Sequence, residues 1–230
     1  MIHILWCTIR PTYFTSVHPR WIINAENKSN IKTYVCVNTQ DQYDYIRKYD
    51  EKIDIEISDD PNRIGVCYPS YLLSSKLKGD KNDIVVFASD DFVPPIKWDT
   101  YLINKLDGKD GCLMVRDGYQ LPDSSNMQYP AITIPIMTFS CLERLNKIIY
   151  NPSYNHMYSD CELYLNLKEL GLLIDDRIND ITVFEHHHYA AGKRQPDFND
   201  QNYNKKWKDD ESKWNIRKNM KVEERIKYDK

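Results

Sequence analysis

The stretch DIVVFASDDFVPPIKWDTYL, residues 83–102, decides the fold. Residues 84–88 form the most strongly apolar run of the chain, which is typical of a strand buried on both faces. Asp90 and Asp91 follow this run directly. Ligands bind beyond the carboxyl ends of parallel strands, so we expect the two acids at a binding edge. Adjacent carboxylates repel each other unless a cation neutralises them, and Mn²⁺ or Mg²⁺ suits their oxygens.

Strands and helices alternate on both sides of this stretch. Apolar or alternating runs predict further strands, and amphipathic patterns predict helices, one of which opens with the capping box T-x-x-Q. The predicted strands are 2–8, 31–37, 52–57, 84–88, 111–117, 131–139 and 180–184, and the predicted helices are 39–49, 65–78, 140–150, 159–171 and 199–229. This order indicates an α/β fold with a mostly parallel sheet. We expect one domain over residues 1–200 and a C-terminal helical arm over residues 201–230.

Composition limits the class of protein. The 230 residues are 41% hydrophobic and 28% charged, which is enough for a packed core. Residues 204–230 hold ten basic and six acidic residues, a local charge of +4 that leaves −7 for the rest of a chain whose net charge is −3. Such an arm can meet an anionic partner, but packing on its own body is commoner. No signal peptide and no membrane span are recognisable, so we expect a cytoplasmic protein, in the host cytoplasm if it is viral. The six scattered cysteines form no CxxC pair and predict free thiols.

The acids after residues 84–88 have no glycine-rich partner loop. A Walker B strand also ends in acids, but the chain contains no GxxxxGK[ST], and it contains no GxGxxG either. A P-loop ATPase and a Rossmann dinucleotide site are therefore excluded. Phosphates, if they bind, must be held by a metal and by side chains, whereas the alternative is a solvated acidic turn.

Residues 83–102 resemble the metal-binding DxD-type segment of GT-A glycosyltransferases, especially the family 2-like enzymes. The resemblance lies in the apolar strand, the two acids, the proline and the Trp-Asp pair; Ser89 replaces the first Asp of a strict DxD. It implies a GT-A-like α/β/α sandwich, a nucleoside-diphosphate sugar as donor, and Mn²⁺ or Mg²⁺ as cofactor. It further implies that Asp91 binds the metal and that Asp90 contacts the ribose or assists the metal.

Three other segments resemble nucleotide-binding parts of the same family. Thr8 and Arg10 lie in TIRP after the first strand, where related enzymes have a nucleotide loop, and Asn38 ends the second strand, where the family contacts the nucleoside. Arg63 lies in NRIG, which resembles the N-x-G stretch where an arginine faces the diphosphate. The resemblance implies that these four residues bind the nucleotide sugar, although arginines in such places are more often plain surface residues.

The stretch SDCE, residues 159–162, allows two interpretations. Ser159 at N-cap and Glu162 at N3 make a capping box, which would explain the pattern on structural grounds alone. Asp160 would then lie in the first helical turn, where the helix dipole favours its ionised form. The segment also resembles the family's D-x-E segment, in which an acid activates the acceptor hydroxyl. We therefore expect Asp160 to be the catalytic base, with Glu162 as the second candidate.

Three histidines follow the last predicted strand. Alternation along an extended chain places His186 and His188 on one face and His187 on the other. In GT-A enzymes a histidine after the last core strand commonly completes the metal shell, so the resemblance implies that His186 or His188 binds the metal. It also implies that residues 189–197 form a loop that closes over the donor.

Taken together, these features predict a metal-dependent glycosyltransferase whose acceptor the sequence does not name, and the resemblance favours inversion. A glycan and a hydroxymethylated base of viral DNA are both candidate acceptors. A nucleotidyltransferase of related fold is an alternative, but it usually has a glycine-rich loop where this chain has TIRPTYFTS. A non-catalytic nucleotide-sugar-binding module is the third hypothesis. Trp207 and Trp214, seven residues apart on one helix face, predict that the arm packs on the body.

Overall fold

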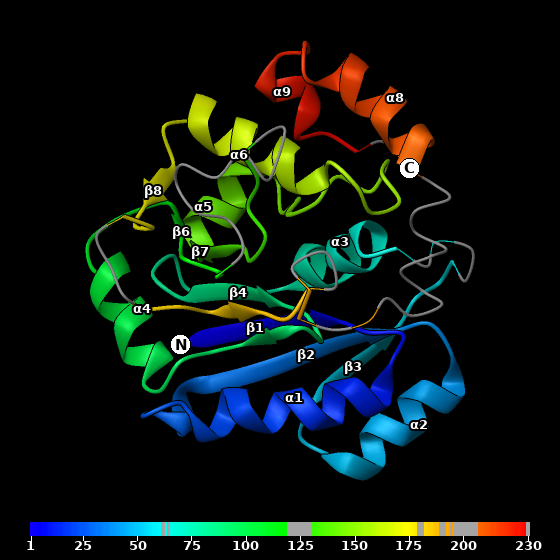
Figure 1. Cartoon of the computed structure of the whole chain (residues 1–230), viewed down its shortest axis with the longest axis vertical. Helices are drawn as coiled ribbons and strands as arrows, with labels where there is room; N and C mark the ends of the chain where they lie inside the picture. Colours follow the sequence, from blue (N-terminus) through cyan, green and yellow to red (C-terminus); the bar gives the residue numbers. More distant parts are fainter. Residues whose placement is uncertain are drawn as a thin grey trace.

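A computed structural model of the chain describes residues 1–60, 63, 65–118, 130–178, 182–188, 192–193, 195 and 207–228. Within these ranges a seven-stranded sheet, ordered β3-β2-β1-β4-β7-β6-β8, lies between helices on both faces (Figure 1). The predicted α/β/α sandwich is therefore confirmed. No helix of the described residues is long and apolar enough to cross a membrane.

The N-terminal half, residues 1–91, contributes four parallel strands. These are β1 (Ile2–Cys7), β2 (Ile31–Val37), β3 (Asp54–Ile57) and β4 (Ile84–Ala88). β1 is central and pairs in parallel with β2 on one side and β4 on the other. The carboxyl ends of β1, β2 and β4 therefore meet at one edge, which brings the segments after Cys7, Val37 and Ala88 together.

The C-terminal half, residues 92–230, completes the sheet with mixed pairing. β7 (Ile136–Thr138) is antiparallel to both β4 and β6 (Cys112–Met114), and β6 is parallel to β8 (Leu173–Asp175). A second, two-stranded sheet joins β5 (Phe92–Val93) to β9 (Glu185–His186). This small sheet brings the chain that follows Asp91 beside the predicted histidines.

Helices cover each face of the main sheet, with a separate apolar core beneath each layer. Trp21 of α1, Ile46 of α2 and Trp98 of α4 share one core, whereas Leu72 of α3, Leu142 of α5 and Leu163 of α6 share the other. Trp214 of α8 joins the second core, where α8 and α9 lie outside α6 (Figure 1). The helices are α1 (Pro11–Ile23), α2 (Gln40–Tyr49), α3 (Cys67–Lys76), α4 (Trp98–Leu106), α5 (Phe139–Arg144), α6 (Ser159–Glu169), α8 (Trp207–Arg217) and α9 (Val222–Arg225), with a short 3-10 turn at Lys28–Asn30.

Several local features differ from the sequence prediction. α1, α4 and β8 were not predicted; α1 has proline at its first position, but it has no side-chain cap and no acidic residue in its first turn, and Pro19 interrupts its interior. The strands expected at 111–117 and 131–139 are shorter, and the tail forms two helices rather than one. The capping box of Thr39 and Gln42 is confirmed. The strand expected at 180–184 and the start of the helix expected from 199 lie partly outside the described residues.

One contact between the two halves is unusually close. A Cβ placed on Gly65 would lie 1.6 Å from the backbone oxygen of Asn155, where no atom fits. Only glycine therefore allows the segment before α3 to lie directly against the loop before α6.

Candidate functional site

Asp90 lies at the centre of a buried polar network between two strand ends. Its carboxylate accepts hydrogen bonds from Trp6 Nε1 at 2.7 Å and Thr8 Oγ1 at 2.8 Å, and Arg10 Nε lies 3.3 Å away. Burial raises the pKa of Asp90 to about 6, although these donors favour the charged form. The structure thus brings together Thr8, Arg10 and Asp90, and adds Trp6, which the sequence analysis took only as part of a strand.

Asp91 contacts His186 across the small sheet, whereas Asp90 contacts residues of β1 and the segment after it. Its Oδ2 lies 3.4 Å from His186 Nε2, because β5 pairs with β9 in a register that places Phe92 opposite His186. The Phe92 and His186 rings stack with centroids 4.2 Å apart, and Ser89 donates a hydrogen bond to Asp91. Burial alone would raise the pKa of Asp91, but the hydrogen bond and charge of His186 outweigh it and hold the pKa well below its usual range.

A further acid, Asp117, lies behind His186. His186 donates its backbone N–H to the Asp117 carbonyl at 2.9 Å, and its Nδ1 lies 3.8 Å from the buried Asp117 carboxylate. Burial would lower the pKa of His186, but Asp117 and then Asp91 raise it to about 9. A carboxylate behind a ligating histidine fixes the orientation of its ring in many metal sites. Sequence reasoning missed Asp117, although its place at the end of a predicted strand was an available signal.

The three histidines alternate as predicted. The His186 and His188 rings lie 5.0 Å apart, whereas His187 pairs with Glu185 at 3.0 Å. The predicted loop 189–197 lies almost wholly outside the described residues.

The contact between Asp91 and His186 fits a divalent cation. Two ligands that each lie about 2.1 Å from one ion at a right angle are about 3 Å apart, and the observed separation of 3.4 Å is close to that. Within the described part of the chain, no group of three or more His, Cys, Asp or Glu side chains is arranged to hold a metal. Such a site would need further ligands from a bound phosphate or water, as is usual for Mg²⁺.

Asn38 lies beside this network at the end of β2. Its backbone N–H donates to Gln42 Oε1 at 2.8 Å, and Gln42 Nε2 donates to the Ile9 carbonyl at 3.1 Å. The side-chain Nδ2 of Asn38 is buried and has no hydrogen-bond partner among the described residues. Since buried donors are normally satisfied, this one is a candidate ligand contact.

Arg63 is engaged away from the acids. Its Nη1 donates to the Tyr228 hydroxyl at 2.6 Å, its Nε lies 3.2 Å from Asp60, and its guanidinium lies over the Tyr68 ring. The structure therefore joins Arg63 to the last described residues of the arm rather than to Asp90 or Asp91.

Asp160 and Glu162 have different surroundings at the start of α6. Asp160 is partly exposed, and burial of its carboxyl raises its pKa above the ordinary value. Glu162 is buried and accepts two hydrogen bonds from Arg217 and one from Tyr154, all at 2.8 Å. The predicted capping box is wrong: Tyr158 is the N-cap residue in a left-handed conformation, and Ser159, inside the helix, donates to the His156 carbonyl.

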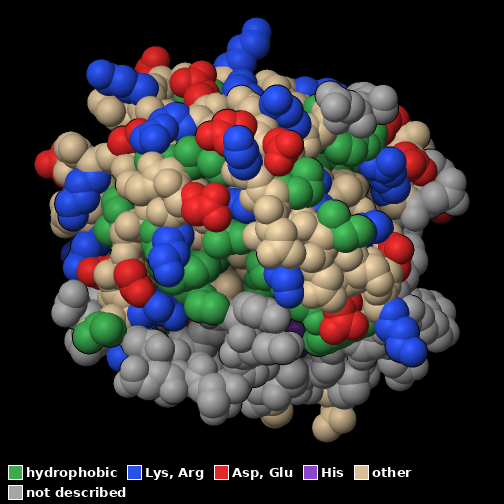
Figure 2. Space-filling model, turned by 90° about the horizontal axis from the view of Figure 1, so that it is seen from above, with side chains coloured by type: hydrophobic (Ala, Val, Ile, Leu, Met, Phe, Trp, Pro, Cys, Tyr) green, Lys and Arg blue, Asp and Glu red, His purple; other side chains and the backbone are tan. Residues whose placement is uncertain are grey.

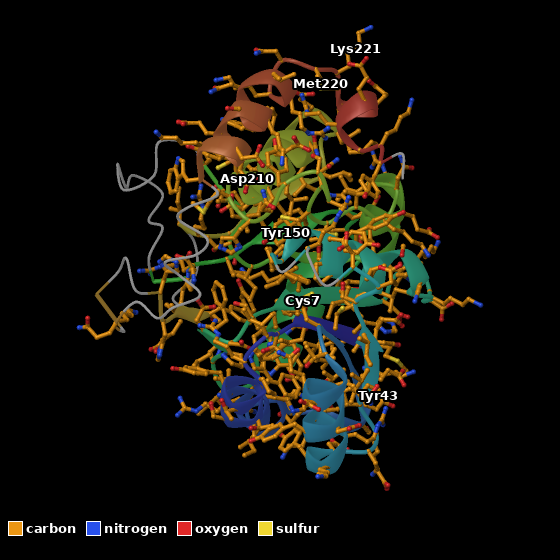
Figure 3. All side chains as sticks on the ribbon, turned by 90° about the vertical axis from the view of Figure 1, so that its right-hand side faces the viewer. Cys7, Tyr43, Tyr150, Asp210, Met220 and Lys221 are labelled. Carbon is orange, nitrogen blue, oxygen red and sulfur yellow. The ribbon has the colours of Figure 1, made fainter. Side chains whose placement is uncertain are left out.

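The buried Tyr150 lies close enough to both Asp160 and Cys7, at the end of β1, for each to influence its pKa. Burial first, and then the nearby Asp160 carboxylate and the Cys7 thiol among others, raise the pKa of the Tyr150 hydroxyl. Asp90 in turn is among the groups that raise the pKa of Cys7, after burial. Tyr150 and Cys7 lie near each other in the middle of the molecule (Figure 3). All six cysteines are free thiols, as predicted.

Comparisons with known proteins identify the fold. No family model and no curated protein matches the sequence. Among solved structures, S. aureus TarS in complex with UDP-GlcNAc matches with a TM-score of 0.60 and 13% identity over 80% of this chain and 57% of that one. The mannosyltransferase PcManGT from Pyrobaculum calidifontis, in complex with GDP-Man and Mn²⁺, matches with a TM-score of 0.56 and 13% identity over 76% and 54%. The fold is therefore that of GT-A glycosyltransferases, and the chain spans little more than half of each of these structures.

A third solved structure belongs to another class of enzyme. 4-diphosphocytidyl-2C-methyl-D-erythritol synthase matches with a TM-score of 0.50 and 11% identity over 84% of this chain and 96% of that one. The architecture alone therefore does not separate glycosyltransferases from other classes of enzyme.

Proposed function

We propose that this chain is a metal-dependent glycosyltransferase that moves a sugar from a nucleoside-diphosphate sugar to an acceptor hydroxyl with inversion. The observation that carries the proposal is the contact of Asp91 with His186, two residues 95 positions apart in the sequence, beside the buried Asp90 network. The solved structures with UDP-GlcNAc and with GDP-Man and Mn²⁺ support a donor of this class.

The donor would lie along the ends of β1, β2 and β4. The buried Asn38 amide supports a contact with a base or ribose oxygen, because it is a donor without a partner in the described structure. Thr8 and Arg10 would contact the diphosphate of the donor, since Arg10 lies beside Asp90. The main role of Asp90 would then be to hold Thr8 and Arg10 in place rather than to bind the metal. Arg63 would reach a donor only if it gave up its hydrogen bond to Tyr228.

Asp91 and His186 would hold a divalent cation, and His188 is the third candidate ligand. When bound there, Mn²⁺ or Mg²⁺ would neutralise negative charge on the diphosphate leaving group. Asp117 would keep the His186 ring oriented through its 3.8 Å contact with Nδ1.

Asp160 would accept the proton of the acceptor hydroxyl. As that oxygen forms its bond to the anomeric carbon, the bond from this carbon to the diphosphate breaks and the nucleoside diphosphate departs with the electron pair. Burial raises the pKa of Asp160 and so makes it a stronger base than an exposed aspartate. Glu162, the second candidate, is held by Arg217 and Tyr154 and is a poor choice for this proton.

A binding screen tests the proposal. The chain is heated with UDP, GDP, UDP-GlcNAc or GDP-Man, each with and without Mn²⁺, and its unfolding temperature is recorded. We expect at least one nucleotide to raise this temperature only when Mn²⁺ is present, because binding to the folded state alone stabilises it. No stabilisation by any of the four with Mn²⁺ would contradict the proposal for these donors.

The products separate the remaining alternatives. A glycosyltransferase releases a nucleoside diphosphate from its donor, whereas a nucleotidyltransferase consumes a nucleoside triphosphate and releases pyrophosphate. A nucleotidyltransferase of related fold is kept as the second candidate, because the fold is shared with enzymes that are not glycosyltransferases. A binding module would give the thermal shift with neither product.

The acceptor remains a glycan or a hydroxymethylated base of viral DNA in this proposal. The face that carries α8 and α9 shows basic and acidic side chains interspersed rather than one continuous basic patch (Figure 2). Two of the arm's arginines, Arg217 and Arg225, already pair with Glu162 and Glu169. DNA binding through this face should therefore be weak, and a gel-shift series over salt with plain and hydroxymethylated duplexes measures it. Tight, salt-sensitive binding would instead favour a DNA acceptor.

A further inference from the structure

One face of α8 lies against the start of α6. Asp210, Trp214 and Arg217 are spaced by four and three residues, so they lie on the same side of the helix. Each contacts a different part of the segment 155–162, which contains Asp160 (Figure 3 labels Asp210 where the arm meets the body). The importance of this face for catalysis rests on the proposed role of Asp160 as the base.

Asp210 binds the backbone of the loop before α6. Its side chain is fully buried, and its two oxygens accept three backbone N–H groups: Oδ1 from Asn155 at 2.9 Å, and Oδ2 from His156 at 2.8 Å and Met157 at 2.9 Å. An ionised carboxylate that accepts several backbone N–H groups makes strong, directional bonds. The loop is thereby fixed at three consecutive residues.

Trp214 holds the residue that turns this loop into the helix. Tyr158, the N-cap of α6, has φ of 63°, a conformation that is unfavourable for a bulky side chain and persists only where its surroundings enforce it. The Trp214 ring stacks on Tyr158 with centroids 6.1 Å apart and an interplanar angle of 9°. Ser159 then donates to the His156 carbonyl at 3.0 Å, which joins the fixed loop to the first residue of the helix.

Arg217 provides the third anchor, on the far side of Asp160. Its guanidinium makes two 2.8 Å hydrogen bonds to Glu162 and a third, at 2.7 Å, to the Arg225 carbonyl. Asp160 therefore lies between a loop held by Asp210 and a helical turn held by Arg217.

We infer that Asp210 is a positioning residue for Asp160, and that α8 sets the orientation and burial of the catalytic base. Several ionisable groups face Asp160: Cys67 from α3, Cys161 from α6, and His156 and Tyr150 from the loops. The loop that Asp210 fixes thus carries His156, which lies close enough to Asp160 to influence its pKa, and a loosened loop changes both the electrostatics and the water around the base.

The experiment compares Asp210→Asn with Asp209→Asn as its matched control. Asp209 is the preceding residue, is exposed, and accepts hydrogen bonds from the side chains of Lys213 and Asn155. The Asp160 carboxyl is titrated by NMR in protein labelled with ¹³C at aspartate, and its signal is assigned with Asp160→Asn. Hydrolysis of the nucleotide sugar that binds best among UDP-GlcNAc and GDP-Man is measured in parallel, with water as the acceptor.

We expect Asp210→Asn to lower the pKa of Asp160 towards that of an exposed aspartate and to lower kcat about tenfold, with KM for the donor unchanged. Asp209→Asn should match the wild type in each measurement. A purely structural role would change the folded fraction but neither the pKa of Asp160 nor the rate per folded molecule. If Asp210→Asn does not fold, Trp214→Phe should show the same changes to a smaller degree.

The outcomes separate this inference from the proposed function. If Asp210→Asn and Trp214→Phe, or whichever of them folds, keep the wild-type pKa of Asp160, the positioning role is overturned. If the wild type binds neither nucleotide sugar, the proposed donors are wrong, and the NMR titration still decides whether Asp210 controls the surroundings of Asp160.

Discussion

The two halves of the molecule hold their candidate site residues by different means. In the N-terminal half, Thr8, Asn38 and Asp90 follow the ends of parallel strands, and the backbone ladder of the sheet places them side by side. In the C-terminal half, Asp160 depends on side chains of α8, a helix some 50 residues later in the sequence. Sites of the first kind follow from strand order, whereas sites of the second kind depend on individual tertiary contacts.

The largest effect should come from a substitution at Asp91, where the two halves meet in the small sheet of β5 and β9. Asp91→Asn removes one of the three candidate metal ligands, so we expect Mn²⁺-dependent binding of UDP or GDP to weaken by about 100-fold or more. Calorimetry with and without Mn²⁺ measures this. Asp107→Asn, at an exposed position after α4, serves as the control and should bind as the wild type does. Unchanged metal dependence in Asp91→Asn would show that the metal lies elsewhere.

A change in the C-terminal half should affect turnover without affecting donor binding. Asp160→Asn removes the proposed base, so we expect the rate of transfer or donor hydrolysis to fall by about 10²-fold while the donor affinity is kept. Lys168→Gln, at an exposed position in the last turn of the same helix, serves as the control and should leave the rate nearly unchanged. A wild-type rate in Asp160→Asn would leave this residue with a structural role only.

Glu162 should behave as a structural residue of the same helix. Glu162→Gln leaves the partly buried Arg217 without its ionised partner in a pocket where Glu162 itself is buried, so the free energy of unfolding should fall by about 3 kcal/mol. Urea denaturation measures the loss, and the rate per folded molecule should fall far less than in Asp160→Asn, because the glutamine oxygen still accepts a hydrogen bond from Arg217. A rate that falls by about 10²-fold at full stability would make Glu162, rather than Asp160, the base.

A smaller, pH-dependent effect should appear in the N-terminal half. His18 of α1 is buried between the Tyr49 and Thr33 hydroxyls, each at 3.1 Å, and burial lowers its pKa from 6.5 to about 4. The unfolded chain therefore binds the proton first, so this contribution to stability is complete above pH 6.5 and is lost as the pH falls towards 4. The loss is at most about 3 kcal/mol.

Denaturation curves at about pH 7 and about pH 5 measure this effect, since the two values lie on either side of the unfolded pKa of histidine. His18→Gln should flatten the difference between the two curves, because the variant has no imidazole to titrate. An equal loss of stability on acidification in the variant would assign the pH dependence to other groups.

The sequence predicted the strands of the N-terminal half well because their signals are local. The apolar run 84–88 ends at Asp90 and Asp91, and the position of those acids follows from the strand itself. The start of α6 was harder to predict. Ser159 and Glu162 match the sequence pattern of a capping box, but Glu162 pairs with Arg217, a contact that no local pattern encodes. Arg63 likewise pairs with Tyr228, 165 residues away.

The helices that were not predicted have the same explanation. α1 has no acidic residue in its first turn and no side-chain cap, and it contains Pro19. Its stability comes from burying Phe14 and Trp21 against Trp6 and Trp98. Tertiary packing thus overrides weak local propensity there, as it commonly does.

The close approach of Gly65 to Asn155 has a consequence for how this protein tolerates sequence variation. Because no side chain fits at position 65, a library randomised there and selected for folding should return glycine almost alone, while exposed positions of α2 accept most residues. The same contact joins the segment before α3 to the loop that Asp210 holds. A change at Gly65 would therefore disturb the same loop that the arm holds, which makes this position a sensitive point for unintended loss of activity during engineering.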